Sequence, residues 1–253
     1  MTLIRSLLFV IWLYGTMLVM TLVGLPVLLA PRRLVIAYMR LYTYVMRFGL
    51  RWIAGVRIDI RGREHLPKGP LIIAGTHQAM LDVFIPFFIF DDPMIVMKRE
   101  LLWYPGLGWF AMRTGMLAID RSGTSRTMKQ MLAKARKGMA VGNGRQIVIF
   151  PEGTRAAPGA APDFKSAGVR AFYKALDVPI LPIVTNSGLC WPARGVLRKP
   201  GTVVYEILPP IETGLPHKQM LPRLFGDLEA GAQRLYKEGA LDAPPIKQGE
   251  PVE

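Results

Sequence analysis

The chain has 253 residues, of which 51% are hydrophobic, and its 32 lysines and arginines outnumber the 18 acidic residues to give a formal net charge of +14. This apolar content excludes a disordered chain, and the single cysteine, Cys190, excludes a disulfide scaffold and a cysteine-rich zinc site. A basic chain that is also this hydrophobic indicates contact with an anionic bilayer, and the lone thiol fits a reducing compartment.

The first element is an apolar run over residues 6–30 that carries no charge. About 20 such residues suffice to cross a bilayer. A signal peptide and a buried core helix are the alternatives, but the run is longer than a usual signal segment and ends in Val-Leu-Leu-Ala, without an Ala-x-Ala cleavage site. Pro26 is expected to kink or end the helix, so a full span and a dip into one leaflet both remain open.

The next helical segment carries an arginine stripe. Arg33, Arg40, Arg47 and Arg51 are spaced by seven, seven and four residues, so they share one helix face among apolar and aromatic neighbours. Helices at membrane interfaces have this composition, although a surface helix of a soluble core is the alternative. The arginine excess places the rest of the chain on the cytoplasmic side. We therefore expect residues 1–55 to form a two-helix membrane module with the stripe at the lipid headgroups.

Short apolar strands alternate with amphipathic helices after this segment. The pattern predicts an α/β domain over residues 56–242, with a mostly parallel sheet flanked by helices. Residues 243–253 hold three prolines and no helical pattern, which indicates a mobile tail. The strands are expected at residues 56–60, 70–75, 93–97, 116–119, 145–150, 178–184 and 202–208, and the principal helices at 128–139, 164–176 and 221–238.

One histidine follows a predicted buried strand. His77 comes directly after the segment 70–75, at the strand end where a parallel sheet opens into its ligand crevice. Asp82 lies five positions later and meets His77 if the histidine lies in the turn and the aspartate reaches back from the first helical turn. A carboxylate on one ring nitrogen raises the basicity of the other, as deprotonation of a hydroxyl requires. The alternative is a capping aspartate beside a packed histidine.

Charged clusters follow three further strands. Lys98 comes after the strand 93–97, Asp120 and Arg121 after 116–119, and the turn 150–155 after 145–150. The turn residues of interest are Glu152, Gly153, Thr154 and Arg155, with Lys165 a short way downstream. If the strands are parallel, these groups and His77 share one edge of the sheet. A forked guanidinium suits a phosphate group, whereas solvated charges and an ordinary turn are the alternatives.

These motifs, taken in order, resemble those of the glycerolipid acyltransferases, in particular the 1-acylglycerol-3-phosphate O-acyltransferases. The resemblance covers about residues 56–210. It rests on the His-x4-Asp block at residues 76–82, the block 98–108, the segment 115–121, the Phe-Pro-Glu-Gly-Thr-Arg turn with residues 164–168, and Val-Pro-Ile-Leu-Pro-Ile at 178–183. Thr76 and Ala79 stand where the family often has Asn and Ser, which leaves the acceptor lipid open.

The resemblance implies an acyltransferase of the cell inner membrane, with its catalytic domain on the cytoplasmic side. It would move a fatty acyl chain from acyl-CoA or acyl-carrier protein to the sn-2 hydroxyl of lysophosphatidic acid, giving phosphatidic acid. His77 is then the general base and Asp82 its partner. Arg121 and the turn 152–155 form the acceptor-phosphate site, with Lys98 and Lys165 as further contacts. No Gly-x-Ser-x-Gly elbow occurs, so we expect direct attack without an acyl-enzyme, a metal or a cofactor.

Three rival functions are weighed against this one. A nucleic-acid-binding protein would explain the positive charge, but it explains neither the apolar segment nor the ordered motifs, and no nucleic-acid motif occurs. A non-catalytic lipid-binding protein on the same fold would be expected to lack His77 or Asp82. An acyltransferase for another acceptor, such as a lyso-ornithine lipid or another lysophospholipid, fits the motifs as well.

Overall fold

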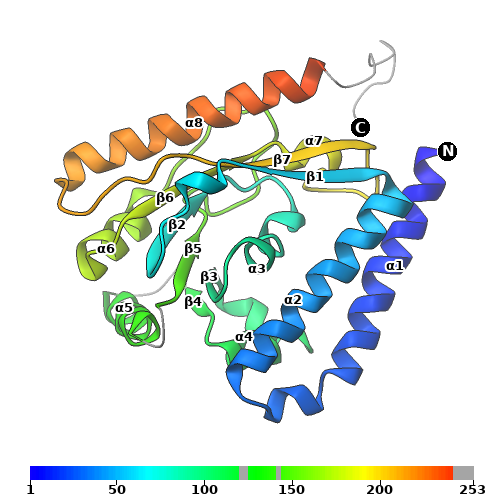
Figure 1. Ribbon diagram of the computed structural model, residues 1–253, viewed down its shortest axis with the longest axis horizontal. Coiled ribbons are helices and arrows are strands. Elements are labelled where there is room, and N and C mark those ends of the chain that lie inside the picture. The colour runs from blue at the N-terminus through cyan, green and yellow to red at the C-terminus, as the bar shows by residue number, and fades with distance from the viewer. Residues whose placement is uncertain (120–124, 141–143, 242–253) are drawn as a thin grey trace.

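The computed structural model describes residues 1–119, 125–140 and 144–241. Its centre is a seven-stranded sheet in the order β1-β7-β6-β2-β5-β3-β4 (Figure 1). The strands are β1 (Val56–Arg61), β2 (Leu71–Gly75), β3 (Pro93–Lys98), β4 (Leu117–Ile119), β5 (Gln146–Ile149), β6 (Ile180–Thr185) and β7 (Gly201–Ile207). Each expected strand forms, with its ends within two residues of the prediction.

Parallel pairing dominates the sheet. Every neighbouring pair of strands is parallel except β6 and β7, which run antiparallel. The predicted α/β class with a mostly parallel sheet is therefore confirmed. The α-helices are α1 (Thr2–Val23), α2 (Arg32–Gly49), α3 (Pro86–Ile89), α4 (Leu107–Thr114), α5 (Ser125–Met139), α6 (Ser166–Leu176), α7 (Ser187–Cys190) and α8 (His217–Leu241).

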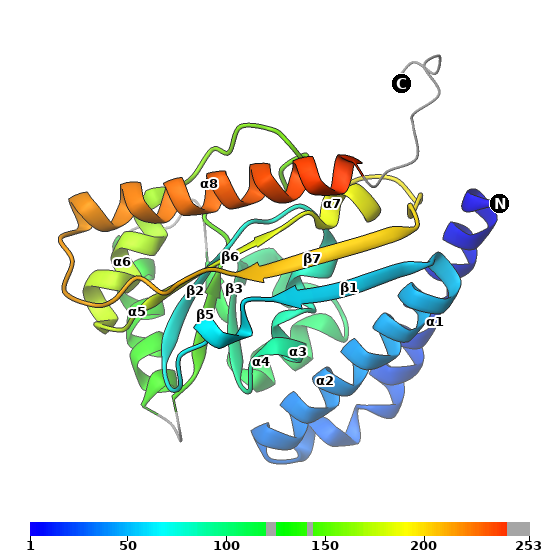
Figure 2. The same cartoon turned by 45° about the horizontal axis from the view of Figure 1, so that its top comes forward.

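Two hydrophobic clusters cover the two faces of the sheet. Alternate residues of β2 divide between them, since Leu71 and Ile73 belong to one cluster and Ile72 and Ala74 to the other. Buried side chains of α5, α6 and α8 join the second cluster. The first contains side chains of α1, α2 and α3, which lie on the side of the sheet opposite α8 (Figures 1 and 2).

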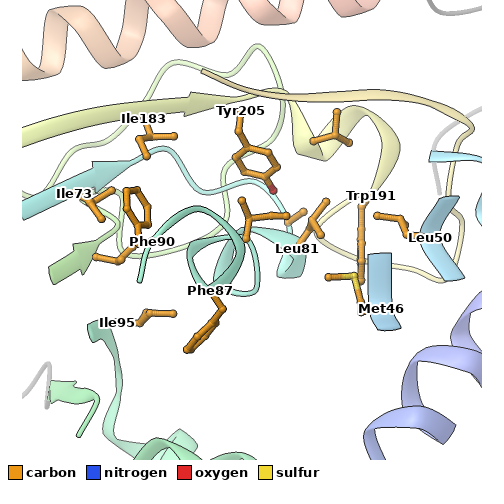
Figure 3. Packing of buried hydrophobic residues seen from close by; sticks show 14 of the residues in the cluster. Met46, Leu50, Ile73, Leu81, Phe87, Phe90, Ile95, Ile183, Trp191 and Tyr205 are labelled. Atoms are coloured by element: carbon orange, nitrogen blue, oxygen red, sulfur yellow. The ribbon is translucent and has the colours of Figure 1, made fainter. Parts of the chain in front are cut away.

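The first two helices form a hairpin packed on the domain. A 3-10 turn, η1 (Pro26–Leu29), joins α1 to α2, so the helix ends near Pro26 as predicted. Near the start of α1, the Ser6 hydroxyl accepts the Arg198 backbone N–H at 2.8 Å, and Phe9 packs edge-on against Trp191 with ring centroids 5.4 Å apart. In Figure 3, Trp191 lies between the domain interior and Met46 and Leu50 of the hairpin side.

The other end of α1 also contacts the domain. Tyr38 of α2 donates to the Met20 carbonyl at 2.6 Å and stacks on Phe110 of α4. Arg113 of α4 donates to the carbonyls of Leu28 and Ala30 in the hairpin turn. The hairpin is thus held by the domain at both ends. In the described part of the chain, α1 is the one helix long and apolar enough to cross a membrane by length and composition.

The arginine stripe of α2 divides into two pairs. Arg40 donates to the carbonyls of Phe87, Phe90 and Asp91 at 2.9–3.0 Å, where α3 ends, and Arg47 stacks on the Phe88 ring at 3.6 Å. The other two arginines, Arg33 and Arg51, are exposed. The prediction that all four arginines lie at headgroups is therefore wrong for Arg40 and Arg47, because their side of α2 packs against α3.

A small ion-pair cluster ties the start of α2 to the sheet. Asp92, at the entry to β3, binds Arg32 at 2.6 Å and Arg145 at 3.0 Å. Arg145 is 4% exposed and also donates to the Thr114 carbonyl. Burial lowers the pKa of this guanidinium, so the Asp92 carboxylate is its principal compensation.

Candidate active site

The predicted residues gather where parallel strands end. Ala74 of β2 pairs with Ile149 of β5, and Ile95 of β3 pairs with Val148 of β5. Residues shortly after each strand therefore reach the same edge of the sheet. His77 follows β2, Lys98 ends β3 and the turn 150–155 follows β5, which places them as predicted. Arg121, like the neighbouring Asp120, lies outside the described residues.

His77 and Asp82 meet directly. The Nδ1 atom of His77 lies 3.0 Å from Oδ2 of Asp82. His77 precedes the 3-10 turn η4 (Met80–Val83), and Asp82 reaches back from that turn, so the predicted contact is confirmed. Helical structure begins at Met80 as a 3-10 turn, which is tighter than an α-helical turn. With Nδ1 occupied, Nε2 is left to face a substrate.

The Asp82 carboxylate is buried and fully engaged. Its Oδ2 atom also accepts the backbone N–H groups of Gln78 and Ala79 at 2.7 and 2.8 Å, which fixes the turn. Its Oδ1 atom accepts the hydroxyl of Tyr205, a buried residue of β7, at 2.7 Å. A small pocket lined mainly by aliphatic and aromatic side chains adjoins Asp82 and Tyr205.

The histidine itself is positioned from the neighbouring strand. Its ring stacks on Phe150 with centroids 4.5 Å apart, and its side chain keeps 16% exposure. Its backbone N–H donates to Oε1 of Glu152 at 3.2 Å, and its carbonyl accepts the N–H of Ala156 at 2.8 Å. The turns after β2 and β5 are therefore joined by a side-chain and a backbone hydrogen bond.

Glu152 is a buried carboxyl with one oxygen unsatisfied. It is 6% exposed, and among the described residues its Oε2 atom has no hydrogen-bond partner. Burial raises the pKa of Glu152 to about 7, against the opposing effect of the hydrogen bond from His77. Glu152 therefore contacts the His77 backbone from the protein interior. This role differs from the direct phosphate contact that the resemblance implied.

The last two residues of the Pro-Glu-Gly-Thr-Arg turn face solvent. Gly153 donates to the Phe150 carbonyl at 3.0 Å and takes a φ of 66°, a left-handed conformation that glycine adopts without steric cost. Thr154 and Arg155 then emerge as exposed side chains. This places the backbone of Arg155 beside the histidine turn, since Ala156, the next residue, bonds to the His77 carbonyl.

Two lysines differ in their freedom to bind an anion. Lys98 is exposed at the last position of β3. Lys165 is also exposed, but its Nζ atom pairs with Asp163, while its backbone N–H donates to the Pro151 carbonyl at 2.8 Å. The backbone of Lys165 thus lies beside the turn after β5, as the sequence suggested, and its charge is already partly compensated.

Sequence reasoning missed the hydrogen bonds that tie the dyad and its neighbours to β6, α7 and β7. Thr76 accepts the N–H of Thr185 through its hydroxyl at 3.0 Å, and Gln78 accepts the N–H of Gly188. The bond from Tyr205 to Asp82 is the third. The alternation in β7 indicated that Val203, Tyr205 and Ile207 share a face, and all three lie in one cluster, but it gave no signal that this face meets Asp82.

The described residues contain neither a metal-binding cluster nor a reactive cysteine. No group of three or more His, Cys, Asp or Glu side chains there is arranged to hold a metal ion. The cysteine is buried, and burial raises the pKa of Cys190 to about 11, so little thiolate is available near neutral pH.

Comparison with known proteins places the site in context. Residues 57–186 match the family model described as Acyltransferase. The chain is 32% identical over 198 residues to a 1-acyl-sn-glycerol-3-phosphate acyltransferase of Pseudomonas aeruginosa, covering 78% of this chain and 74% of that one. It is 28% identical to the alpha enzyme of that name from Mus musculus, covering 76% and 68%, and 30% identical to the Limnanthes alba enzyme, of which it spans 61%.

A solved structure shares the fold. The crystal structure of the 1-acyl-sn-glycerophosphate (LPA) acyltransferase PlsC from Thermotoga maritima superposes with a TM-score of 0.74. The superposition covers 93% of this chain and 99% of that one, at 20% sequence identity. At that identity the likeness supports the architecture alone.

Proposed function

The chain belongs to the acyltransferase family, and from this premise we propose that it transfers a fatty acyl chain from acyl-CoA or acyl-carrier protein to the sn-2 hydroxyl of lysophosphatidic acid, giving phosphatidic acid for phospholipid synthesis. The observation that carries the mechanism is the His77–Asp82 hydrogen bond at the ends of parallel strands. The named activity of its relatives supports the acceptor.

In this mechanism Nε2 of His77 takes the proton of the acceptor hydroxyl as its oxygen attacks the thioester carbonyl. Asp82, held at Nδ1, stabilises the imidazolium that forms. Collapse of the tetrahedral intermediate breaks the carbon–sulfur bond, and the proton on His77 passes to the departing thiolate. The donor is a substrate, so the reaction needs no resident cofactor or metal.

The acceptor phosphate is assigned to the basic groups at the same edge. Arg155 is an exposed residue next to Ala156, whose backbone bonds to His77, and Lys98 ends β3. An Arg fork binds phosphate oxygens in a bidentate manner, which would fix the glycerol hydroxyl near Nε2. Gly153 and Thr154 complete the turn, Lys165 lies beside it through its backbone, and Arg121 belongs to the assignment by resemblance.

We also propose that the α1–α2 hairpin dips into one leaflet and holds the domain at the cytoplasmic face of the inner membrane. Both ends of α1 contact the domain, so a crossing of the bilayer would carry part of the domain with it. The outer face of α1 instead exposes Ile4, Ile11 and Leu18, each more than 60% exposed and one heptad apart.

An aromatic patch beside the hairpin turn supports this orientation. Trp103, Tyr104 and Trp109 are 81%, 60% and 43% exposed, and they lie at η5 (Arg99–Trp103) and α4. Trp and Tyr are enriched at membrane interfaces. Arg113 of α4 binds the hairpin turn, so the element that carries Trp109 is attached to the end of the hairpin.

The second candidate is the same chemistry on another lyso-lipid acceptor, which Thr76 and Ala79 leave open. The experiment that decides is turnover by the purified full-length protein in vesicles, with a panel of lyso-lipids and with acyl-CoA and acyl-carrier-protein donors. Acylation of lysophosphatidic acid well above every other acceptor supports the proposal. A preference for lyso-ornithine lipid or a different lysophospholipid overturns the assigned acceptor and leaves the acyltransferase reaction in place.

A further inference from the structure

The carboxylate of Asp82 is held by a side chain of β7, the last described strand along the chain. Three donors bind Oδ2 of Asp82, and a single donor, the Tyr205 hydroxyl, binds Oδ1 at 2.7 Å across 123 positions of sequence. Figure 3 shows the Tyr205 ring extending from its strand, with the hydroxyl directed toward the turn that carries Leu81.

The protonation state of this tyrosine is clear from its surroundings. It is 3% exposed, and burial together with the negative charge of Asp82 raises the pKa of Tyr205 well above its usual range. The hydroxyl therefore stays protonated and acts as the donor to the carboxylate. A buried donor to an ionised acceptor is among the stronger hydrogen bonds in proteins.

We propose that Tyr205 is a positioning residue for acyl transfer, which keeps the Asp82 carboxylate aimed at His77 and limits how strongly it holds the imidazole proton. The inference rests on the proposed role of the dyad. Tyr205 bonds Oδ1 of Asp82 while His77 bonds Oδ2, so the proposed effect on His77 passes through the carboxylate.

Loss of the Tyr205 hydroxyl should shift the pH profile of kcat/KM in a definite direction. A hydrogen bond to Oδ1 disperses the carboxylate charge, so its loss leaves a more localised charge that binds the imidazolium more tightly. The acidic limb of the kcat/KM profile then moves to higher pH. The other titratable group facing the dyad is Glu152, from the turn after β5, whose pKa is raised to about 7 by burial. The profile therefore has to be recorded also in a Glu152→Gln background.

The test is Tyr205→Phe in the full-length protein, assayed in vesicles with lysophosphatidic acid and acyl-CoA. We expect kcat to fall roughly five- to thirtyfold, as for a lost charge-assisted bond, while both KM values stay within about twofold. The acidic limb should rise by about half a pH unit or more, and should do so in the Glu152→Gln background.

The matched control is Tyr173→Phe, which removes another buried hydroxyl. The Tyr173 hydroxyl donates to the Glu212 carbonyl and accepts the Leu215 N–H, both at 3.0 Å, away from the dyad. We expect this variant to lose stability without a change in the pH profile.

Replacement of Tyr205 by 3-fluorotyrosine keeps the ring and strengthens the donor, so it should move the acidic limb to lower pH.

Two outcomes overturn the inference: a Tyr205→Phe profile that superposes on that of Tyr173→Phe, or a fluorotyrosine shift in the same direction as the phenylalanine shift. Wild-type turnover on lysophosphatidic acid tests the proposed function separately. If that turnover is absent, the downfield NMR signal of the His77 Nδ1 proton still reports on Tyr205, because it should move in Tyr205→Phe and stay fixed in Tyr173→Phe.

Discussion

The Glu152 carboxylate and the His77 backbone, 75 positions apart, are joined by a 3.2 Å hydrogen bond. This bond couples the two turns on which the site is built, because it fixes the backbone immediately before the histidine side chain. It also places a carboxyl in a buried position where its second oxygen has no partner among the described residues. The free-energy cost of burying this carboxyl can be measured from the pH dependence of stability.

We expect the stability of the protein to depend on pH through Glu152. Its pKa is raised from 4.5 to about 7, so in that window the folded state binds more protons than the unfolded state and the free energy of unfolding falls as pH rises. Glu152→Gln removes this term, so the variant should gain up to about 3 kcal/mol relative to wild type between about pH 4.5 and 7. Thermal melts across pH measure it, with exposed Glu64→Gln as the control; parallel curves would contradict a raised pKa.

Loss of either dyad member should abolish transfer without unfolding the protein. We expect no detectable turnover in His77→Ala and a loss of at least about a hundredfold in Asp82→Ala, the lower range for general-base function. Asp82→Asn keeps an oxygen for the turn amides and separates the two roles of this residue. Asp59→Ala, at an exposed ion pair with Arg61, is the control. Near-normal turnover in His77→Ala would refute the mechanism.

Removal of the exposed guanidinium should weaken acceptor binding selectively. Arg155→Ala is expected to raise KM for the lyso-phospholipid by roughly tenfold, the worth of one charge-assisted contact, with KM for the donor and kcat nearly unchanged. Lys165→Ala should have a smaller effect, because its Nζ atom already pairs with Asp163. Initial rates with each substrate varied in turn provide the measurement, and a defect confined to the donor would reassign the site.

Neighbouring aspartates before β3 should differ sharply in their effect on stability. Asp92→Ala leaves the buried Arg145 without its carboxylate and should cost about 3–5 kcal/mol, as the loss of one partner of a buried pair does. Asp91→Ala removes a fully exposed partner of Arg40 at 3.8 Å and should leave the free energy of unfolding nearly unchanged, because solvent screens this pair. Denaturant unfolding of both variants decides, and equal losses would show that burial of Arg145 does not matter.

The two pairs of arginines on α2 should separate membrane affinity from folding. Arg33→Gln with Arg51→Gln should weaken binding to anionic vesicles by about 2 kcal/mol at low salt, since each exposed arginine contributes about 1 kcal/mol. The melting temperature should not change. Arg40→Gln with Arg47→Gln should lower the melting temperature through lost contacts with α3. Vesicle sedimentation with anionic and zwitterionic lipid measures the first effect, and thermal melts measure the second. If vesicle binding falls only in the Arg40/Arg47 variant, the headgroup contact belongs to that pair and the assignment is wrong.

The sequence was informative wherever structure depends on neighbours along the chain. Buried strands appear as apolar runs, and the spacing of His77 and Asp82 limited how the two could meet. Tyr205 could not be assigned, because its partner lies 123 positions away and alternation only says which residues share a face. The arginine stripe failed for a related reason, since periodicity places Arg40 and Arg47 on one side of α2 but does not identify α3 as the neighbour of that side.

Finally, the position of β1 imposes an order on biosynthesis. In the sheet β1 borders only β7, and Val56 pairs with Gly201, so the first strand to leave the ribosome waits for the last. In the proposed orientation, the hairpin ahead of it would already offer lipid an apolar face during that interval. A nascent chain tethered to the bilayer in this way would keep its unpaired edge away from other chains, and such edges otherwise promote aggregation. The proposed membrane contact would then serve assembly of the domain as well as its position.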